Sequence, residues 1–256
     1  MLNTIKLTQT DEMKKFELLG LGLLLSIILI SCSKDGDPNQ VATQETLSTI
    51  LPKKVNYIEN IDYDKIGRDT YLTYNGNKLV SSILHNRWKS VFTYTGDLIT
   101  KIENFDYGVL FSTTDYTYTN GKLDSRFIKN TEVQNPYSYM TYYVHNTDGT
   151  ISYSSSSRNG KLTFKDGNLI NDGYRSFEYD TKNNPFINIV GIGVLSIDDD
   201  SEVDLNVSKN NRIKSSENGY SSTNSITFNS NGYPTVDNGF YNGSTTGNSS
   251  YKYYYE

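Results

Sequence analysis

The sequence predicts an all-β protein: an antiparallel meander of repeated β-hairpins that forms a curled or barrel-like sheet in one domain. Three observations predict it. Similar segments recur along the chain, at intervals of roughly 20–25 residues that are typical of repetitive architectures. Aromatic residues stand two apart in these segments, so they share one face of a strand. Asn-Gly and Asp-Gly pairs follow them, and glycine accepts the positive φ of a tight hairpin turn.

The clearest copies of the repeat cover residues 71–83, 92–102 and 116–127, and each places alternating Leu and Ile after its turn glycine. Looser copies occupy residues 141–151, 164–170, 177–186 and 226–233. The chain ends on Tyr251 and Tyr253, which resemble the first half of one more unit. One hairpin is marginal in water, so neighbouring units must pair edge to edge. The Asn, Gly, Ser, Thr and Tyr usage disfavours helices throughout this part.

The N-terminal segment has the organisation of an export signal. Lys14 and Lys15 precede an apolar stretch over residues 18–30, which is too short for the roughly 20 apolar residues of a membrane-spanning helix. A basic start before a short apolar stretch is typical of a signal peptide. We therefore predict a signal helix within residues 1–31, with Met13 as the natural start.

Cys32 is the only cysteine in the 256 residues, and it stands where the apolar run ends. A single cysteine excludes an intramolecular disulfide framework. The segment 29–32, Leu-Ile-Ser-Cys, resembles the lipobox of bacterial lipoproteins, which implies cleavage before Cys32 and lipid on its thiol. The alternative is an ordinary secretory signal with a chance cysteine. Two acyl chains hold a protein on a membrane firmly, whereas one does so only marginally.

Three regions follow from these features. Residues 1–31 are the predicted lipoprotein signal peptide, residues 32–54 the lipidated cysteine with a flexible tether, and residues 55–256 the β domain. The tether has the polar composition of a flexible linker. We expect a membrane partner through the lipid on Cys32.

The pattern Tyr-x-x-Gly-x-Leu-x-x-Ile resembles the YD, or Rhs-type, repeat. The chain is similar over roughly residues 55–256 to uncharacterised Bacteroidetes and Flavobacteria-type lipoproteins with degenerate copies of that repeat, some of which have a porin-like β fold. Tyr179-Asp180 alone keeps the Asp of true YD repeats in register. The segment 33–37, Ser-Lys-Asp-Gly-Asp, resembles the acidic stretch of lipoproteins exported to the cell surface. The resemblance implies a lipid-anchored, surface-exposed place at the outer membrane and no known reaction.

Composition limits the partners. The net charge is −5 and no basic block occurs, so the sequence lacks the electrostatic footprint of nucleic-acid binding. We find no nucleophile, acid–base or metal pattern, and we therefore predict no enzyme activity and no cofactor. His85 and His145 lie far apart in the sequence without a second His or Cys at ligand spacing, and we interpret them as strand histidines.

Two groups are candidate binding residues. The first group brings three recognition-type side chains together in the sequence, His85, Arg87 and Trp88. Pockets are typically lined with aromatic and a few polar groups. The alternative is that Trp88 packs in the sheet.

The second group is a dense acidic run. It is a calcium candidate, since Ca²⁺ favours several carboxylate oxygens in one loop. The alternative is a solvated loop or a charged strand edge. The run consists of Asp198, Asp199, Asp200, Glu202 and Asp204.

We therefore predict a non-catalytic binding module at the outer membrane, which takes a glycan or an envelope protein. The alternative is a structural or scaffold lipoprotein of the envelope without a small ligand.

Overall fold

The structure is a computed structural model that describes residues 49–61, 64–131, 136–198, 203 and 205–255. The chain divides into two units, Met1–Thr46 and Leu47–Glu256, and every described residue belongs to the second. The predictions for the signal peptide and for Cys32 lie outside the described residues.

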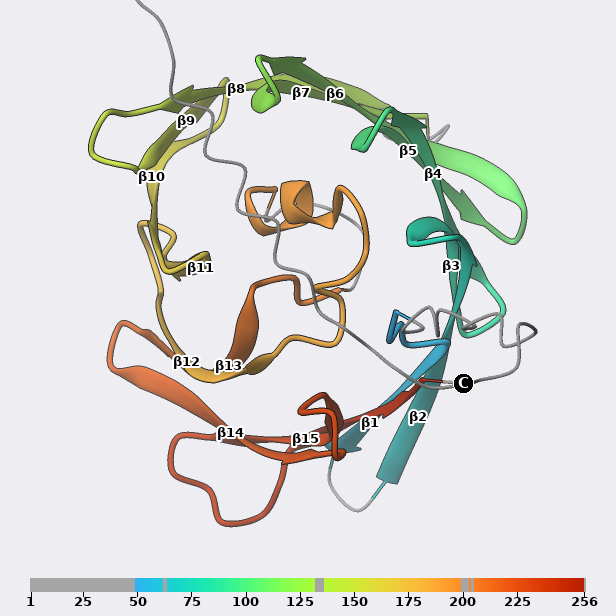
Figure 1. The fold of residues 1–256 in the computed structure, drawn as a ribbon, viewed down its shortest axis with the longest axis vertical. Helices are drawn as coiled ribbons and strands as arrows, with labels where there is room; N and C mark the ends of the chain where they lie inside the picture. Colours follow the sequence, from blue (N-terminus) through green and yellow to red (C-terminus); the bar gives the residue numbers. More distant parts are fainter. Residues whose placement is uncertain (1–48, 62–63, 132–135, 199–202, 204, 256) are drawn as a thin grey trace, which may run out of the picture. The chain divides into compact units, whose positions relative to one another are not determined.

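The second unit is a closed barrel of antiparallel strands in which each strand pairs with its neighbours in the sequence (Figure 1). This confirms the predicted all-β meander of hairpins. The strands are β1 (Lys54–Ile61), β2 (Asp64–Asn75), β3 (Lys78–Leu84), β4 (Trp88–Thr95), β5 (Leu98–Asp106), β6 (Val109–Thr119), β7 (Lys122–Asn130), β8 (Tyr137–His145), β9 (Ile151–Ser155), β10 (Asn159–Lys165), β11 (Asn168–Asn171), β12 (Ser176–Asn183), β13 (Asn210–Glu217), β14 (Tyr220–Phe228), β15 (Pro234–Tyr241) and β16 (Ser249–Tyr254).

The pairing of β1 with β16 closes the barrel, with Val55 opposite Tyr253 and Tyr57 opposite Tyr251. The C-terminal strand resembles half a repeat unit, and β1 supplies the strand that pairs with it as the second half. Closure removes the two free edges that an open sheet would expose.

The turn dipeptides adopt the conformation that the hairpins need. Asn120 and Gly121 have φ of 52° and 74° in the β6–β7 turn, and Asp166 and Gly167 have φ of 52° and 84° in the β10–β11 turn. Positive φ at both central residues matches the right-handed twist of the flanking strands. The repeat segments 71–83, 92–102 and 116–127 accordingly fall on β2–β3, β4–β5 and β6–β7.

The two faces of the barrel wall differ in polarity. Phe92 and Ile102 face each other across β4 and β5, and both are buried in the interior. Lys101 and Glu103 flank Ile102, point the opposite way and form an ion pair of 3.6 Å, because side chains alternate along a strand. Further charged pairs stand on the outer face, Lys54 with Asp69 and Lys214 with Glu178.

Tyrosines of the repeat tie neighbouring hairpins together. The hydroxyl of Tyr118 donates to the carbonyl of Ile99, that of Tyr74 to Pro52 and that of Tyr255 to Pro234, each at 2.7 Å. His145 takes the equivalent place in its unit, with Nε2 donating to the Leu123 carbonyl at 2.9 Å. Burial raises the pKa of Tyr74, Tyr118 and Tyr255, so these hydroxyls stay protonated as donors.

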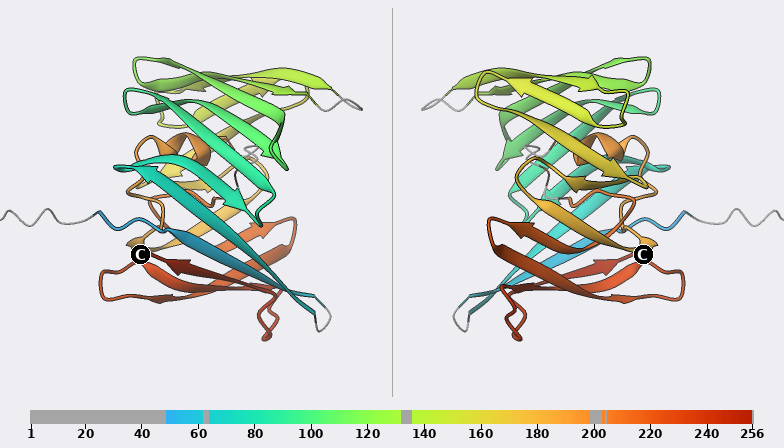
Figure 2. Two further views of the ribbon diagram at one scale, coloured as in Figure 1. Left: turned by 90° about the vertical axis from the view of Figure 1, so that its right-hand side faces the viewer. Right: turned by 90° about the vertical axis from the view of Figure 1, so that its left-hand side faces the viewer.

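The barrel has two rims, seen from the side in Figure 2. The near rim carries residues 49–53, the β2–β3 turn and residue 255, where the Lys53 amide donates to the Tyr254 carbonyl at 2.7 Å. The far rim carries the β3–β4, β5–β6 and β11–β12 turns. Leu51 and Pro52, which the sequence analysis counts with the tether, are buried in the barrel at the near rim.

The described residues between β12 and β13, which are 184–198, 203 and 205–209, lie inside the barrel, and we call them the plug (Figure 1). Among the residues that the structure describes, its 3₁₀ helix η1 (Ile192–Ser196) is the only helix. Phe186, Ile189, Ile192 and Leu195 join the wall residues in one hydrophobic core. The plug fills interior space that the wall side chains alone leave open.

Asp198 anchors the plug to the wall. Its carboxylate pairs with the Arg126 guanidinium, and both side chains are buried, at 0% and 1% exposure. The Tyr116 hydroxyl donates to Asp198 at 2.7 Å, and Arg126 Nη2 donates to Thr141 Oγ1 at 3.2 Å. Burial raises the pKa of Tyr116, so this phenol remains a donor.

A close approach of backbones holds the plug at the near rim. The Val190 amide donates to the Asn77 carbonyl at 2.9 Å. Gly191 has φ of 72°, and a Cβ there would stand 2.6 Å from the Asp97 carbonyl oxygen. Only glycine fits such a position without displacing the β4–β5 turn.

Candidate functional site

The predicted cluster of His85, Arg87 and Trp88 lies at the far rim. His85 and Asn86 form the β3–β4 turn with φ of 52° and 54°. Arg87 donates to both carboxylate oxygens of Asp106, at 2.5 and 2.8 Å. This ion pair raises the pKa of Arg87 and lowers that of Asp106.

The Arg87 guanidinium also lies between two aromatic rings, 4.2 Å from the Trp88 centroid and 4.9 Å from that of Tyr107. Trp88 is 37% exposed and lines a cavity of about 300 Å³ with Arg68, Leu84 and other neighbours. The structure therefore brings Arg87 and Trp88 together, while neither His85 nor Arg87 lines this cavity and Arg87 is engaged within the protein. A ligand-binding role for the cluster stays a prediction.

The acidic run is described only in part. Asp198 is in the buried pair with Arg126, while Asp199, Asp200, Glu202 and Asp204 lie outside the described residues. An adjacent guanidinium repels a divalent cation, so the calcium role is no longer supported at Asp198 and stays a prediction for the other four. Within the described ranges, no group of three or more His, Cys, Asp or Glu could hold a metal ion.

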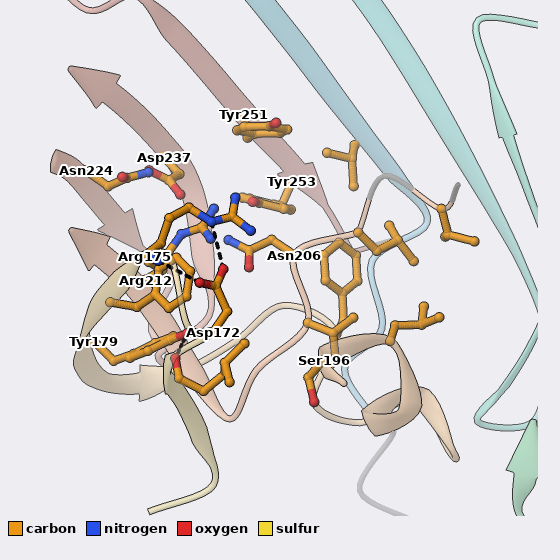
Figure 3. A pocket seen from close by; sticks show the side chains of 18 residues that line it. Asp172, Arg175, Tyr179, Ser196, Asn206, Arg212, Asn224, Asp237, Tyr251 and Tyr253 are labelled. Atoms are coloured by element: carbon orange, nitrogen blue, oxygen red, sulfur yellow. Dashed lines mark hydrogen bonds and ion pairs between the residues drawn. The ribbon is translucent and has the colours of Figure 1, made fainter. Parts of the chain in front are cut away.

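A further candidate site is a cavity of about 500 Å³ inside the barrel, between the plug and the wall (Figure 3). Its volume lies in the range of about 300–1,000 Å³ that is common for small-ligand sites. The wall supplies residues of β1 and β11 to β16, and the plug supplies Phe186, Leu195, Ser196 and Asn206. We call it the lumen cavity.

The β11–β12 turn places one ion pair at the far-rim side of the lumen cavity. Asp172 is 2% exposed, and it accepts hydrogen bonds from the Tyr174 and Arg175 amides at 2.9 and 2.6 Å. Arg175 Nε donates to its other oxygen at 2.8 Å. Burial raises the pKa of Asp172, but these hydrogen bonds outweigh it and hold the pKa below its ordinary value. The Arg175 side chain is 43% exposed, so solvent reaches this side.

A second carboxyl lies deeper in the lumen cavity. Asp237 on β15 faces inward opposite Tyr251 on β16, and Asn224 donates to it at 2.7 Å. Burial raises the pKa of Asp237 to about 6, although Asn224 and the charge of Arg212 act in the opposite direction. This carboxyl therefore changes charge within the range from mildly acidic to neutral pH.

Two guanidinium groups converge on one ring of the lumen cavity. Arg175 lies 5.5 Å and Arg212 5.3 Å from the Phe177 centroid. Cation–π attraction stabilises each of these contacts. Figure 3 shows both arginines next to Asn206 and pointing into the cavity.

Tyrosine rings form another side of the lumen cavity. Tyr251 and Tyr253 stack at 6.4 Å with an interplanar angle of 17°, and Tyr253 meets Phe186 of the plug edge-on at 6.2 Å. Figure 3 shows the two tyrosines parallel and close to the arginines. The arrangement combines flat aromatic surface with cationic and hydrogen-bonding groups, which is the chemistry of a binding pocket.

Sequence reasoning did not identify the residues of the lumen cavity, because they come from strands and loops spread between Val55 and Tyr253. One signal was present in the pattern. Arg212 and Asp237 occupy inward positions on their strands, the phase that carries apolar residues in the clear repeats. A polar residue in that phase marks a site where the interior is not merely packed.

The comparisons with known proteins give likenesses among solved structures only. No protein-family model matches the chain, and no curated protein matches it. A solved porin-like protein from Bacteroides uniformis is similar with a TM-score of 0.38 and 11% sequence identity, over 80% of this chain and 96% of that protein.

No helix in the described residues is both long and apolar enough to cross a membrane.

Proposed function

We propose that this protein is a non-catalytic binding lipoprotein, held at the outer membrane by lipid on Cys32 and exposed at the cell surface, which binds a ligand in its lumen cavity. The observation that carries the binding proposal is the cavity itself. Plug and wall together enclose about 500 Å³ and direct Arg212, Asn224 and Asp237 into it. An interior site of this size favours a glycan segment over a folded protein partner.

The outer face of the barrel supports a place outside the hydrocarbon core of the membrane. Barrels that cross a bilayer carry an outward apolar band, and a Lys or Arg at its midplane costs about 2–4 kcal/mol. Here the outer face carries charged pairs such as Lys101 with Glu103 and Lys214 with Glu178. The apolar side chains of the wall face the interior, where they form one hydrophobic core with the plug. A lipid anchor, rather than the wall, is then what attaches the barrel to the membrane.

Binding is tested on a glycan array with the full chain purified in detergent. Tyr253 lines the cavity, whereas its neighbour Tyr254 is 45% exposed on the outer face. We expect Tyr253→Ala to lose binding that Tyr254→Ala retains. Uniformly negative arrays, or equal losses in both variants, would count against a lumen site.

Attachment is tested by labelling cells with a clickable fatty acid. We expect Cys32→Ala to abolish labelling and the neighbouring Ser33→Ala to keep it. Labelling that survives Cys32→Ala would remove the lipid anchor from the proposal.

Surface exposure is tested by digestion of intact cells with an added protease. The chain should be cut without lysis of the cells.

The alternative function is a structural scaffold without a small ligand. The charged and aromatic outer positions, such as Tyr142 at 56% exposure, are the surface that such a scaffold would offer. Cross-linking in cells distinguishes the two functions, since a scaffold yields a stable envelope partner whether or not the lumen cavity is altered.

A further inference from the structure

We infer that the lumen cavity is selective for acidic saccharides, and that Arg212 receives the carboxylate or sulfate of the sugar. This inference rests on the proposed binding function and names its ligand class. Three features carry it: a guanidinium that is in no ion-pair contact with a described carboxylate, a stacked pair of tyrosines in the same cavity, and amide groups placed for sugar hydroxyls.

The charge on Arg212 lacks a close counterion in the described part of the chain. Asp172 pairs with Arg175 at 2.8 Å, and Asp180 is occupied by the Asn211 backbone and side chain at 3.0–3.2 Å. No described carboxylate lies within ion-pair distance of Arg212. Its guanidinium thus keeps its fork of donors for a planar anion.

The position of Arg175 strengthens the demand for an anion. Arg175 and Arg212 lie at almost equal distances from the Phe177 ring, and Figure 3 shows them side by side. Two like charges so placed repel each other. The carboxylate of Asp172 balances Arg175, and Asp237, the other carboxyl of the cavity, loses its charge at mildly acidic pH. An anionic group bound at Arg212 would balance its charge in a partly desolvated site, where charge-assisted hydrogen bonds are strong.

The remaining walls favour a sugar as the carrier of that anion. The parallel rings of Tyr251 and Tyr253 present flat apolar surface, against which the C–H face of a pyranose packs. Asn206 and Asn224 line the same cavity, and their amide groups both donate and accept, as sugar hydroxyls require. Burial raises the pKa of Asp237 to about 6, so at mildly acidic pH this neighbour repels an anion less.

The test measures binding to the full chain in detergent by titration calorimetry at pH 5.5, with four probes. These are oligogalacturonate, its neutral methyl ester, a sulfated galactan oligosaccharide and its desulfated form. We expect an acidic member of at least one pair to bind at least about tenfold more tightly than its neutral partner. Which acid binds separates a carboxylate ligand from a sulfate ligand.

One arginine variant and one lysine variant test whether the preference for the acid depends on Arg212. Arg212→Gln should remove the preference for the acid, with at least about a tenfold loss in affinity. Lys214→Gln is the matched control, because Lys214 lies two residues along β13 on the outer face, paired with Glu178; it should leave affinity unchanged. Circular dichroism and the unfolding midpoint verify that Arg212→Gln is folded.

The outcomes separate the two levels of the argument. Equal affinity for acidic and neutral probes would overturn the acidic selectivity and leave the binding function standing. Equal losses in Arg212→Gln and Lys214→Gln would remove Arg212 from the recognition. No binding of any of the four probes would overturn the acidic-saccharide inference, while a neutral glycan found on the array would still support the binding function.

Discussion

The buried pair between Asp198 and Arg126 is expected to be the strongest single attachment of the plug. The perturbation is Asp198→Asn, which keeps the size of the side chain and an oxygen for the Tyr116 hydroxyl but removes the negative charge. Both charged side chains are almost completely shielded from solvent. The substitution therefore leaves the Arg126 cation buried without its carboxylate.

The magnitude follows from that burial. Removing one partner of a buried ion pair costs about 3–5 kcal/mol, because the remaining charge stays desolvated. For a domain of this size, 1 kcal/mol corresponds to about 2–4 °C in Tm. Asp198→Asn should therefore lower Tm by roughly 6–20 °C. Pairing it with Arg126→Met, which removes the stranded charge, should recover at least about half of the loss.

The assay is urea and thermal unfolding followed by circular dichroism, together with hydrogen exchange of the plug amides. The matched control is Asp97→Asn, since Asp97 is also in an ion pair, with Lys78 at 3.3 Å, but its side chain is 83% exposed. An exposed pair contributes at most about 1 kcal/mol. Relative to the unchanged protein, Asp198→Asn should speed the exchange of plug amides at residues 194–198 more than that of wall amides.

One result would refute this reasoning. The refuting result is a loss of unfolding free energy in Asp198→Asn of less than about 1 kcal/mol, or no larger than the loss in Asp97→Asn. The charges of the pair would then be less desolvated than their low exposure indicates. A loss that Arg126→Met does not relieve would point instead to packing around residue 198.

Three further predictions follow from described contacts. The pKa of Asp237 is raised to about 6 from 3.8, so between these pH values the folded state holds a proton that the unfolded state releases. The free energy of unfolding therefore falls as pH rises from about 4 to 6, by up to about 3 kcal/mol. Asp237→Asn should flatten this fall in urea titrations. Gly191→Ala should lower Tm more than Gly76→Ala, since both have positive φ but only the first Cβ meets a carbonyl, that of Asp97. Tyr118→Phe should cost about 1–3 kcal/mol in urea unfolding, because it leaves a backbone carbonyl without its donor.

Each of these has a result that contradicts it. A pH profile of Asp237→Asn parallel to the unchanged protein would show that Asn224 and Arg212, which lower the pKa of this carboxyl, offset the effect of burial and of the nearby Asp180. Equal Tm values for the two glycine variants would mean that the plug shifts to accommodate the methyl group. Tyr142→Phe, at an exposed position, is the control for Tyr118→Phe and should change stability by less than about 0.5 kcal/mol.

The hairpins could be predicted from the sequence because their determinants are local. Asn120 and Gly121 specify a tight turn whatever surrounds them, and the aromatic pair Tyr116 and Tyr118 sets the inward face of the strand before it. Both features act within one unit of the repeat. Strand direction and face could therefore be assigned for the clear copies without any knowledge of the whole.

Closure and the plug could not be predicted in this way, because they depend on distant partners. Tyr251 and Tyr253 form half a unit in sequence, and only the pairing with Val55 and Tyr57 completes it. The plug contains an apolar run over residues 186–195 that breaks the repeat, and its role appears only when a lumen exists to receive it. The lumen cavity depends on both, so its residues could not be brought together from spacing alone.

The pairing of β1 with β16 also has a consequence for how the chain reaches this state. The last seam joins strands at opposite ends of the barrel sequence, so it forms only after nearly all of the domain has been synthesised and ordered. Long-range closure of this kind is slow. Until it happens, the edges of β1 and β16 stay open to pairing with other chains. Loss of residues 249–254 would leave β1 and β15 as permanent free edges, and we expect such a truncated chain to aggregate rather than to fold into a smaller barrel.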